Sequence, residues 1–172
     1  MIISIFISIL IVAQYILAFF VFHLPGLPVL HWIGWAIWLI SLVFGIGPIF
    51  ILRNQGGVAK GSSYMKTTRL VDTNLYAVVR HPQYLAGILL NFAIILLAQH
   101  WLILLLGAVS AALIWIDIQT ADRNCLEKFG DDYRRYMQHV PQLNFIVGIL
   151  RRARGKSSHE QKSSQINTDF KS

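Results

Sequence analysis

Three side chains that can bind anions or exchange protons, Arg80, His81 and Tyr84, fall within five residues just before a long apolar run. Pro82 lies among them and favours an extended residue before it and a helix start after it. The imidazole of His81 is therefore expected to point in a fixed direction where a helix begins. Polar groups at such a position in a very apolar chain are costly unless they are partnered or functional.

Three interpretations of this cluster compete. It could cap and anchor a helix with no ligand at all. It could bind a metal ion, although one histidine with no second His or Cys at ligand spacing does not complete a zinc site, and we predict no metal. It could also line a cofactor site, which requires that residues elsewhere in the chain converge on it.

The composition indicates an integral membrane protein. Hydrophobic residues make up 55% of the 172 residues and charged residues 13%, and the mean hydropathy is +0.56. These values lie far from those of a soluble domain of this length. The first charged residue is Arg53, and we interpret the uncharged N-terminal run as a permanent membrane span.

The apolar runs predict an all-α fold with about four transmembrane helices, since a span needs about 20 apolar residues. The runs cover residues 2–22, 31–52, 84–98 and 101–116, and the last two form a tight hairpin. Apolar residues then recur at three- and four-residue steps up to Phe129, which predicts a short interfacial helix. Gly130 is expected to end it, and Asp131 to cap a second short helix that ends at Pro141.

Basic residues predict the orientation. Five Lys and Arg lie in the polar segment 53–83, and the other ten follow the fourth span. Both termini and the 53–83 loop should therefore face the cytoplasm. Residues 1–150 are expected to form one membrane-embedded domain, and the basic and polar residues 151–172 a disordered tail.

Two separated segments together resemble the isoprenylcysteine carboxyl methyltransferase and phospholipid methyltransferase families. The first contains Arg80, His81, Pro82 and Tyr84, and the second runs from Leu126 through Phe129-Gly130 to Tyr136. The resemblance covers roughly residues 60–150. It implies a small polytopic enzyme that binds S-adenosylmethionine at its cytoplasmic side and takes a lipidic substrate from the membrane.

The resemblance also implies a set of cofactor contacts, transferred by position. They are Thr68, Arg69, Leu70, Val71, Tyr76, His81, Pro82, Gln83 and Tyr84. Asn74 stands where the family usually has a glycine, and asparagine is the non-glycine residue best suited to a left-handed turn. We expect the loop to be preserved.

The chain departs from the family pattern in the second segment. A pair of glutamates usually occurs where this chain has Ala121-Asp122, and an arginine linked to substrate in the best-known members is replaced by Asp117. Asp117 and Ala121 are one helical turn apart. Asp117 and Asp122 are therefore predicted to supply the carboxylates of the cofactor site.

Methyl transfer from a sulfonium needs a nucleophile held at attack distance and the exclusion of water, without a metal. We predict Arg80, His81 and Tyr84 as the catalytic group: His81 and Tyr84 position the cofactor, and a cation, Arg80 or Arg123, orients an anionic acceptor. The acceptor would be a lipidic or prenylated carboxylate, thiol or amine. The bilayer is the expected partner and nucleic acid is not, and the oligomeric state stays open.

Two other functions fit parts of the pattern. Membrane sterol reductases, which use NADPH, carry a similar Arg-His-Pro segment and a segment close to Cys125 through Gly130. A non-catalytic four-helix scaffold is the third candidate. Cofactor binding distinguishes all three.

Overall fold

A computed structural model describes residues 2–21 and 26–153. The described part of the chain contains helices and loops and no strand, so the prediction of an all-helical fold is confirmed. Its long helices are α1 (Ile2–Val21), α2 (Pro28–Gln55), α3 (Pro82–Ala98) and α4 (Trp101–Phe129). The remaining elements are the short helix η1 (Asn74–Ala77) and α5 (Asp131–His139).

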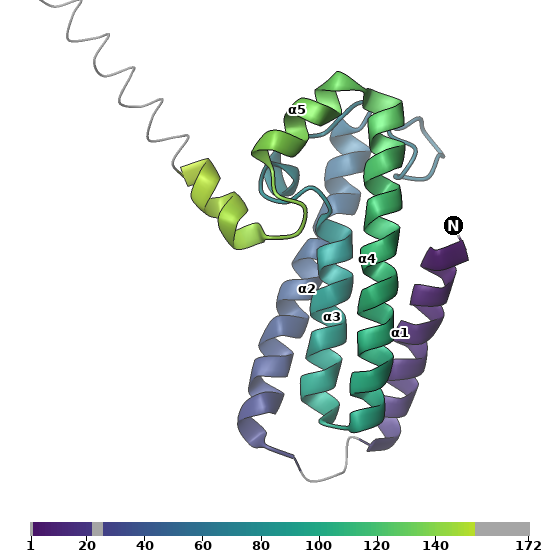
Figure 1. Cartoon of the computed structure of the whole chain (residues 1–172), viewed down its shortest axis with the longest axis vertical. Helices are drawn as coiled ribbons and strands as arrows, with labels where there is room; N and C mark the ends of the chain where they lie inside the picture. The colour runs from purple at the N-terminus through teal and green to yellow at the C-terminus, as the bar shows by residue number, and fades with distance from the viewer. Residues whose placement is uncertain (1, 22–25, 154–172) are drawn as a thin grey trace, which may run out of the picture.

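The four long helices form one elongated bundle, in which α2 packs on α3, α3 on α4, and α4 on α1 (Figure 1). Helices α1, α2 and α4 are long and apolar enough to cross a membrane. Helix α3 is apolar and has 17 residues, which is at the short end of the range of about 17 to 25 residues for a spanning helix. Large apolar side chains, such as Phe19 and Trp32, are exposed on the outside of the bundle. These features are those of a polytopic membrane protein.

The α3–α4 hairpin turns on two residues, as predicted. Gln99 adopts a left-handed conformation (φ +47°) and ends α3, and the side chain of His100 accepts a hydrogen bond from the backbone N–H of Leu102. The amide of Gln99 also binds both the N–H and the carbonyl of Leu27, at 2.8 and 3.0 Å. This side chain ties the hairpin to the start of α2.

The predicted break after residue 116 is wrong. Helix α4 continues without interruption to Phe129, so the segment predicted as a separate interfacial helix is the last part of a single helix of 29 residues. Gly130 ends it with φ +56° and no side-chain cap. Asp131 is the first residue of α5 rather than its cap, so that expectation was also wrong.

The polar loop and α5 gather at one end of the bundle, opposite the hairpin (Figure 1). Residues 145–153 form a further short helix. The predicted tail therefore begins inside a helix, and the rest of it, residues 154–172, lies outside the described residues.

Candidate functional site

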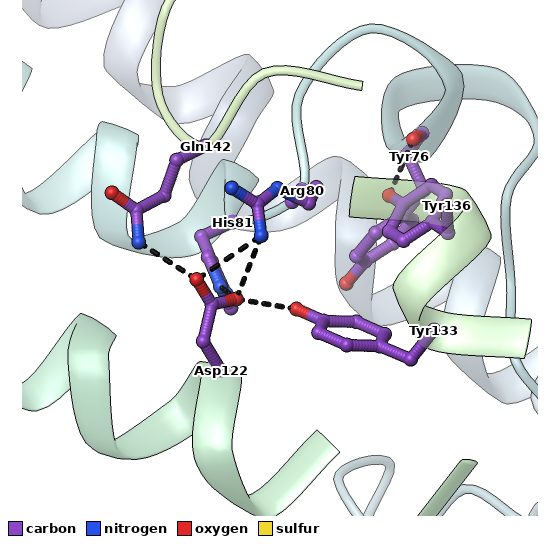
Figure 2. Close-up of polar contacts among 7 residues, drawn as sticks. All are labelled: Tyr76, Arg80, His81, Asp122, Tyr133, Tyr136 and Gln142. Carbon is purple, nitrogen blue, oxygen red and sulfur yellow. Dashed lines mark hydrogen bonds and ion pairs between the residues drawn. The ribbon is translucent and has the colours of Figure 1, made fainter. Parts of the chain in front are cut away.

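Asp122 lies at the centre of the polar end of the bundle. Its side chain is buried and accepts hydrogen bonds from Arg80 (3.1 and 3.2 Å), His81 (2.6 Å), Tyr133 (2.5 Å) and Gln142 (2.8 Å), as Figure 2 shows. The Arg80 contact is an ion pair in which both side chains are about nine-tenths buried. The four donors come from three segments, so this carboxylate of α4 joins the loop before α3, helix α5 and the chain after it.

The backbone reinforces the same junction. The N–H of Arg80 donates to the carbonyl of Pro141 at 3.0 Å, and the N–H of His81 donates to that of Gln142 at 3.3 Å. Pro82 follows as the first residue of α3 and leaves no backbone donor unpaired there. His81 is therefore held by its backbone, its ring and its proline neighbour, as the sequence predicts.

Tyrosines complete the junction. Tyr136 donates to the backbone carbonyl of Tyr76 at 2.5 Å (Figure 2). Burial, followed by the hydrogen bond to Asp122, raises the pKa of Tyr133 well above its usual range. Burial likewise raises the pKa of Tyr136. Both phenols therefore stay protonated and act as donors at neutral pH.

The loop between α2 and α3 folds back on the end of α2. The carbonyl of Gly56 accepts from the N–H groups of Thr68 (2.7 Å) and Arg69 (3.1 Å), and the Thr68 hydroxyl donates to Gly57. Asn74 has φ +52°, which confirms the expected left-handed turn. These turns bring the loop against the starts of α3 and α5.

A cavity of about 190 Å³ lies between this loop and α4. Seven of the predicted site residues line it: Arg69, Leu70, Val71, Tyr76, Arg80, His81 and Gln83. Leu52, Met65, Thr67, Ala121, Cys125, Phe129 and Tyr133, to which we assigned no part in the site, complete the lining. The sequence signal for three of them was the apolar stripe that ends at Phe129.

The other predicted residues lie outside this cavity. The Thr68 hydroxyl holds the loop by its hydrogen bond to Gly57, and Pro82 is buried at the start of α3. Asp122 binds the side chains of Arg80 and His81 without lining the cavity itself. Tyr84 and Asp117 line a second, adjoining cavity instead. Asp117 therefore lines the second cavity and not the first, although Ala121, one turn further along α4, lines the first.

The second cavity has a volume of about 730 Å³ and runs between α1 and α4. It shares five lining residues with the first: Met65, Thr67, Ala121, Cys125 and Phe129. Arg123, one of the two cations predicted to orient a substrate, is exposed and lines neither cavity. The structure thus presents two adjoining cavities with a partly shared lining at the polar end of a membrane bundle.

The fold and the site together define a polytopic helical membrane protein with a buried polar junction and two adjoining cavities at one end. The chain belongs to the phospholipid methyltransferase family, whose model matches residues 29–131. This match spans α2, α3, α4 and the loop that carries the site. The family is a methyltransferase family, which agrees with the resemblance found in the sequence.

Individual relatives are more distant. The chain is 40% identical over 70 residues to methanethiol S-methyltransferase 1 of Bradyrhizobium diazoefficiens. These 70 residues are 40% of the chain and 24% of that protein. It is 30% identical over 121 residues to methanethiol S-methyltransferase 2 of the same organism, 66% of the chain and 43% of the relative.

A third relative belongs to another enzyme class. The chain is 29% identical over 114 residues to a Delta(14)-sterol reductase of Dictyostelium discoideum, 63% of the chain and 21% of that protein. The chain thus spans less than half the length of these relatives. No solved structure is significantly similar to it.

Proposed function

We propose that the chain is an S-adenosylmethionine-dependent methyltransferase that takes a lipophilic acceptor from the bilayer. The observation that carries this proposal is the convergence of seven residues, selected from the resemblance, on the single cavity beside Asp122. The names of the two Bradyrhizobium relatives favour a thiol among the thiol, amine and carboxylate acceptors that the sequence leaves open.

The residues of the smaller cavity fit this cofactor. Arg69 and Arg80 provide cations for a carboxylate, and the Nε of Arg80 is buried without a partner within the described chain. Tyr76, Phe129 and Tyr133 provide aromatic surfaces for a purine ring. The larger cavity, about 730 Å³, falls within the usual range of a ligand site, about 300 to 1,000 Å³, and the smaller, about 190 Å³, lies below it, so the cofactor would extend past the lining residues that the two share.

These residues would act by binding and orientation. S-adenosylmethionine, when bound, supplies a methyl group on a positively charged sulfur. Because His81 is held by Asp122 and by its own backbone, its ring forms a fixed wall of the cavity. Such fixed walls and the exclusion of water favour an in-line transfer.

Cys125 offers a direct test, because it is the single cysteine and lines both cavities. In nanodiscs, saturating S-adenosylmethionine should slow the alkylation of Cys125 by iodoacetamide, and NADPH should not. The Arg123→Gln variant, altered outside both cavities, should show the same protection. Protection by NADPH alone would favour a reductase, as the sterol reductase match would suggest, and protection by neither would overturn the proposal.

We also propose that the end carrying the loop and α5 faces the cytoplasm, as the distribution of Lys and Arg predicts. This orientation would give the water-soluble cofactor access to the smaller cavity. A membrane-impermeant maleimide added to intact cells should then leave a cysteine introduced at Lys60 unlabelled and should label it after lysis. Labelling before lysis would reverse the orientation.

A further inference from the structure

The larger cavity is bounded by one continuous face of α4. Its lining residues there repeat at three- and four-residue steps: Asp117, Thr120, Ala121, Asn124, Cys125, Lys128 and Phe129. Ser4, Ile5, Ser8 and Ile9 of α1 form the opposite side. Helix α1 lies outside the residues that the family model matches, 29–131, whereas the α4 side of the chamber lies inside them.

Asp117 is the acidic residue of this chamber and is only 5% exposed. Its Oδ2 accepts hydrogen bonds from the hydroxyls of Ser4 (2.8 Å) and Tyr84 (3.0 Å). Across the described part of the chain, no donor is bonded to Oδ1 and no cation is paired with Asp117. Oδ2 of Asp117 is thus held by side chains of α1 and α3, while Oδ1 is left to bond a ligand.

The charges of the chamber disfavour an anionic acceptor. Lys128 lines the same chamber, but it lies eleven residues along α4, about 16 Å from Asp117 along the helix axis. At that separation an ion pair contributes little. An acceptor carboxylate placed next to Asp117 would meet a like charge in a low dielectric, whereas an acceptor with an acidic hydrogen could donate it to Oδ1.

Asp117 is also close to the lining that the two cavities share. Ala121, one helical turn away, lines both of them. A nucleophile hydrogen-bonded to Asp117 would therefore lie near the boundary between the two cavities, across which a methyl group would have to be transferred. The apolar residues Ile5 and Ile9 would contact the rest of a lipophilic molecule.

We infer that the α1–α4 chamber is the acceptor site and that Asp117 selects a neutral thiol and takes its proton. This inference rests on the proposed function. The thiol sulfur forms the new bond to carbon with its own lone pair, and its proton passes to Oδ1 of Asp117. The electron pair of the broken carbon–sulfur bond stays with the departing thioether.

The test compares octanethiol with octanoate in nanodiscs, using S-adenosylmethionine labelled in its methyl group. The wild-type protein should methylate octanethiol and not octanoate. Asp117→Asn should lower kcat for octanethiol about 100-fold or more at neutral pH, as expected for the loss of a general base. Its rate should then rise about tenfold per pH unit as the thiol ionises in solution, while the wild-type profile is flatter.

A matched control removes a carboxylate of the same helix outside both cavities. Glu127 is exposed and lines neither of them. Glu127→Gln should therefore keep the wild-type rate and pH profile. As a readout without catalysis, the product methyl octyl sulfide should protect Cys125 from iodoacetamide, and octanoate should not.

The outcomes separate the two proposals. If S-adenosylmethionine fails to protect Cys125, the proposed function fails first. If it protects, the inference about Asp117 is overturned by any of three results: an unchanged pH profile in Asp117→Asn, methylation of octanoate as fast as octanethiol, or no methylation of octanethiol.

Discussion

Replacing Asp122 by alanine should destabilise the polar end of the bundle more than any other single loss of charge. The carboxylate accepts bonds from four side chains, and its removal leaves the guanidinium of Arg80, whose side chain is 10% exposed, without its counter-charge. Breaking a buried ion pair from one side costs about 3 to 5 kcal/mol of unfolding free energy. For a chain of this length that corresponds to a drop in Tm of about 6 to 20 °C.

The assay is thermal unfolding in detergent, monitored by circular dichroism. Glu127→Ala is the matched control, because it removes an exposed carboxylate five residues later on the same helix, and it should leave Tm unchanged. The double variant Arg80→Met/Asp122→Ala should lose less than the sum of the two single variants, with a coupling of about 1 to 3 kcal/mol, because neither charge is then left alone. A Tm for Asp122→Ala within about 2 °C of wild type, or strict additivity, would refute the reasoning.

Two further substitutions test other contacts. A methyl group on Gly148 would lie 1.8 Å from the carbonyl oxygen of Val78. Gly148→Ala should therefore release residues 145–153 and make them susceptible to limited proteolysis. Gly45→Ala is the control: its added methyl group meets only an ordinary contact at 3.6 Å, so this variant should resist the protease like wild type. Tyr136→Phe removes the donor to the partly buried carbonyl of Tyr76 and should lower the unfolding free energy by about 0.5 to 1.5 kcal/mol. An unchanged urea midpoint in detergent would contradict that hydrogen bond.

The long helices could be predicted because membrane spans depend on length and apolarity alone. The break expected after residue 116 was wrong for a physical reason. Hydropathy falls at Asp117, but a helix continues as long as its backbone hydrogen bonds do, and nothing before Gly130 interrupts them. The same error hid the fact that a single helix carries Asp117, Asp122 and the wall that both cavities share.

The candidate site was predictable where its residues are neighbours in sequence or match a motif, as His81 and Gln83 do. The partners that come from far along the chain were not. Ser4 reaches Asp117 across 113 positions, and Gln142 reaches Asp122 from beyond α5. Such contacts depend on which helices pack together, and a pattern of residue types along the chain does not specify that order.

The five-residue spacing of Asp117 and Asp122 on α4 separates them by about 140° around the axis and about 7.5 Å along it. Asp117 therefore lines the larger cavity while Asp122 faces the buried junction with Arg80 and His81, although one helix carries both. Under the proposed function, substitutions at position 117, or at Ser4 across from it, would alter acceptor choice and leave the junction around Asp122 intact. Acceptor choice and the support of the cofactor site would then depend on opposite sides of one helix, so that a substitution could change one without the other.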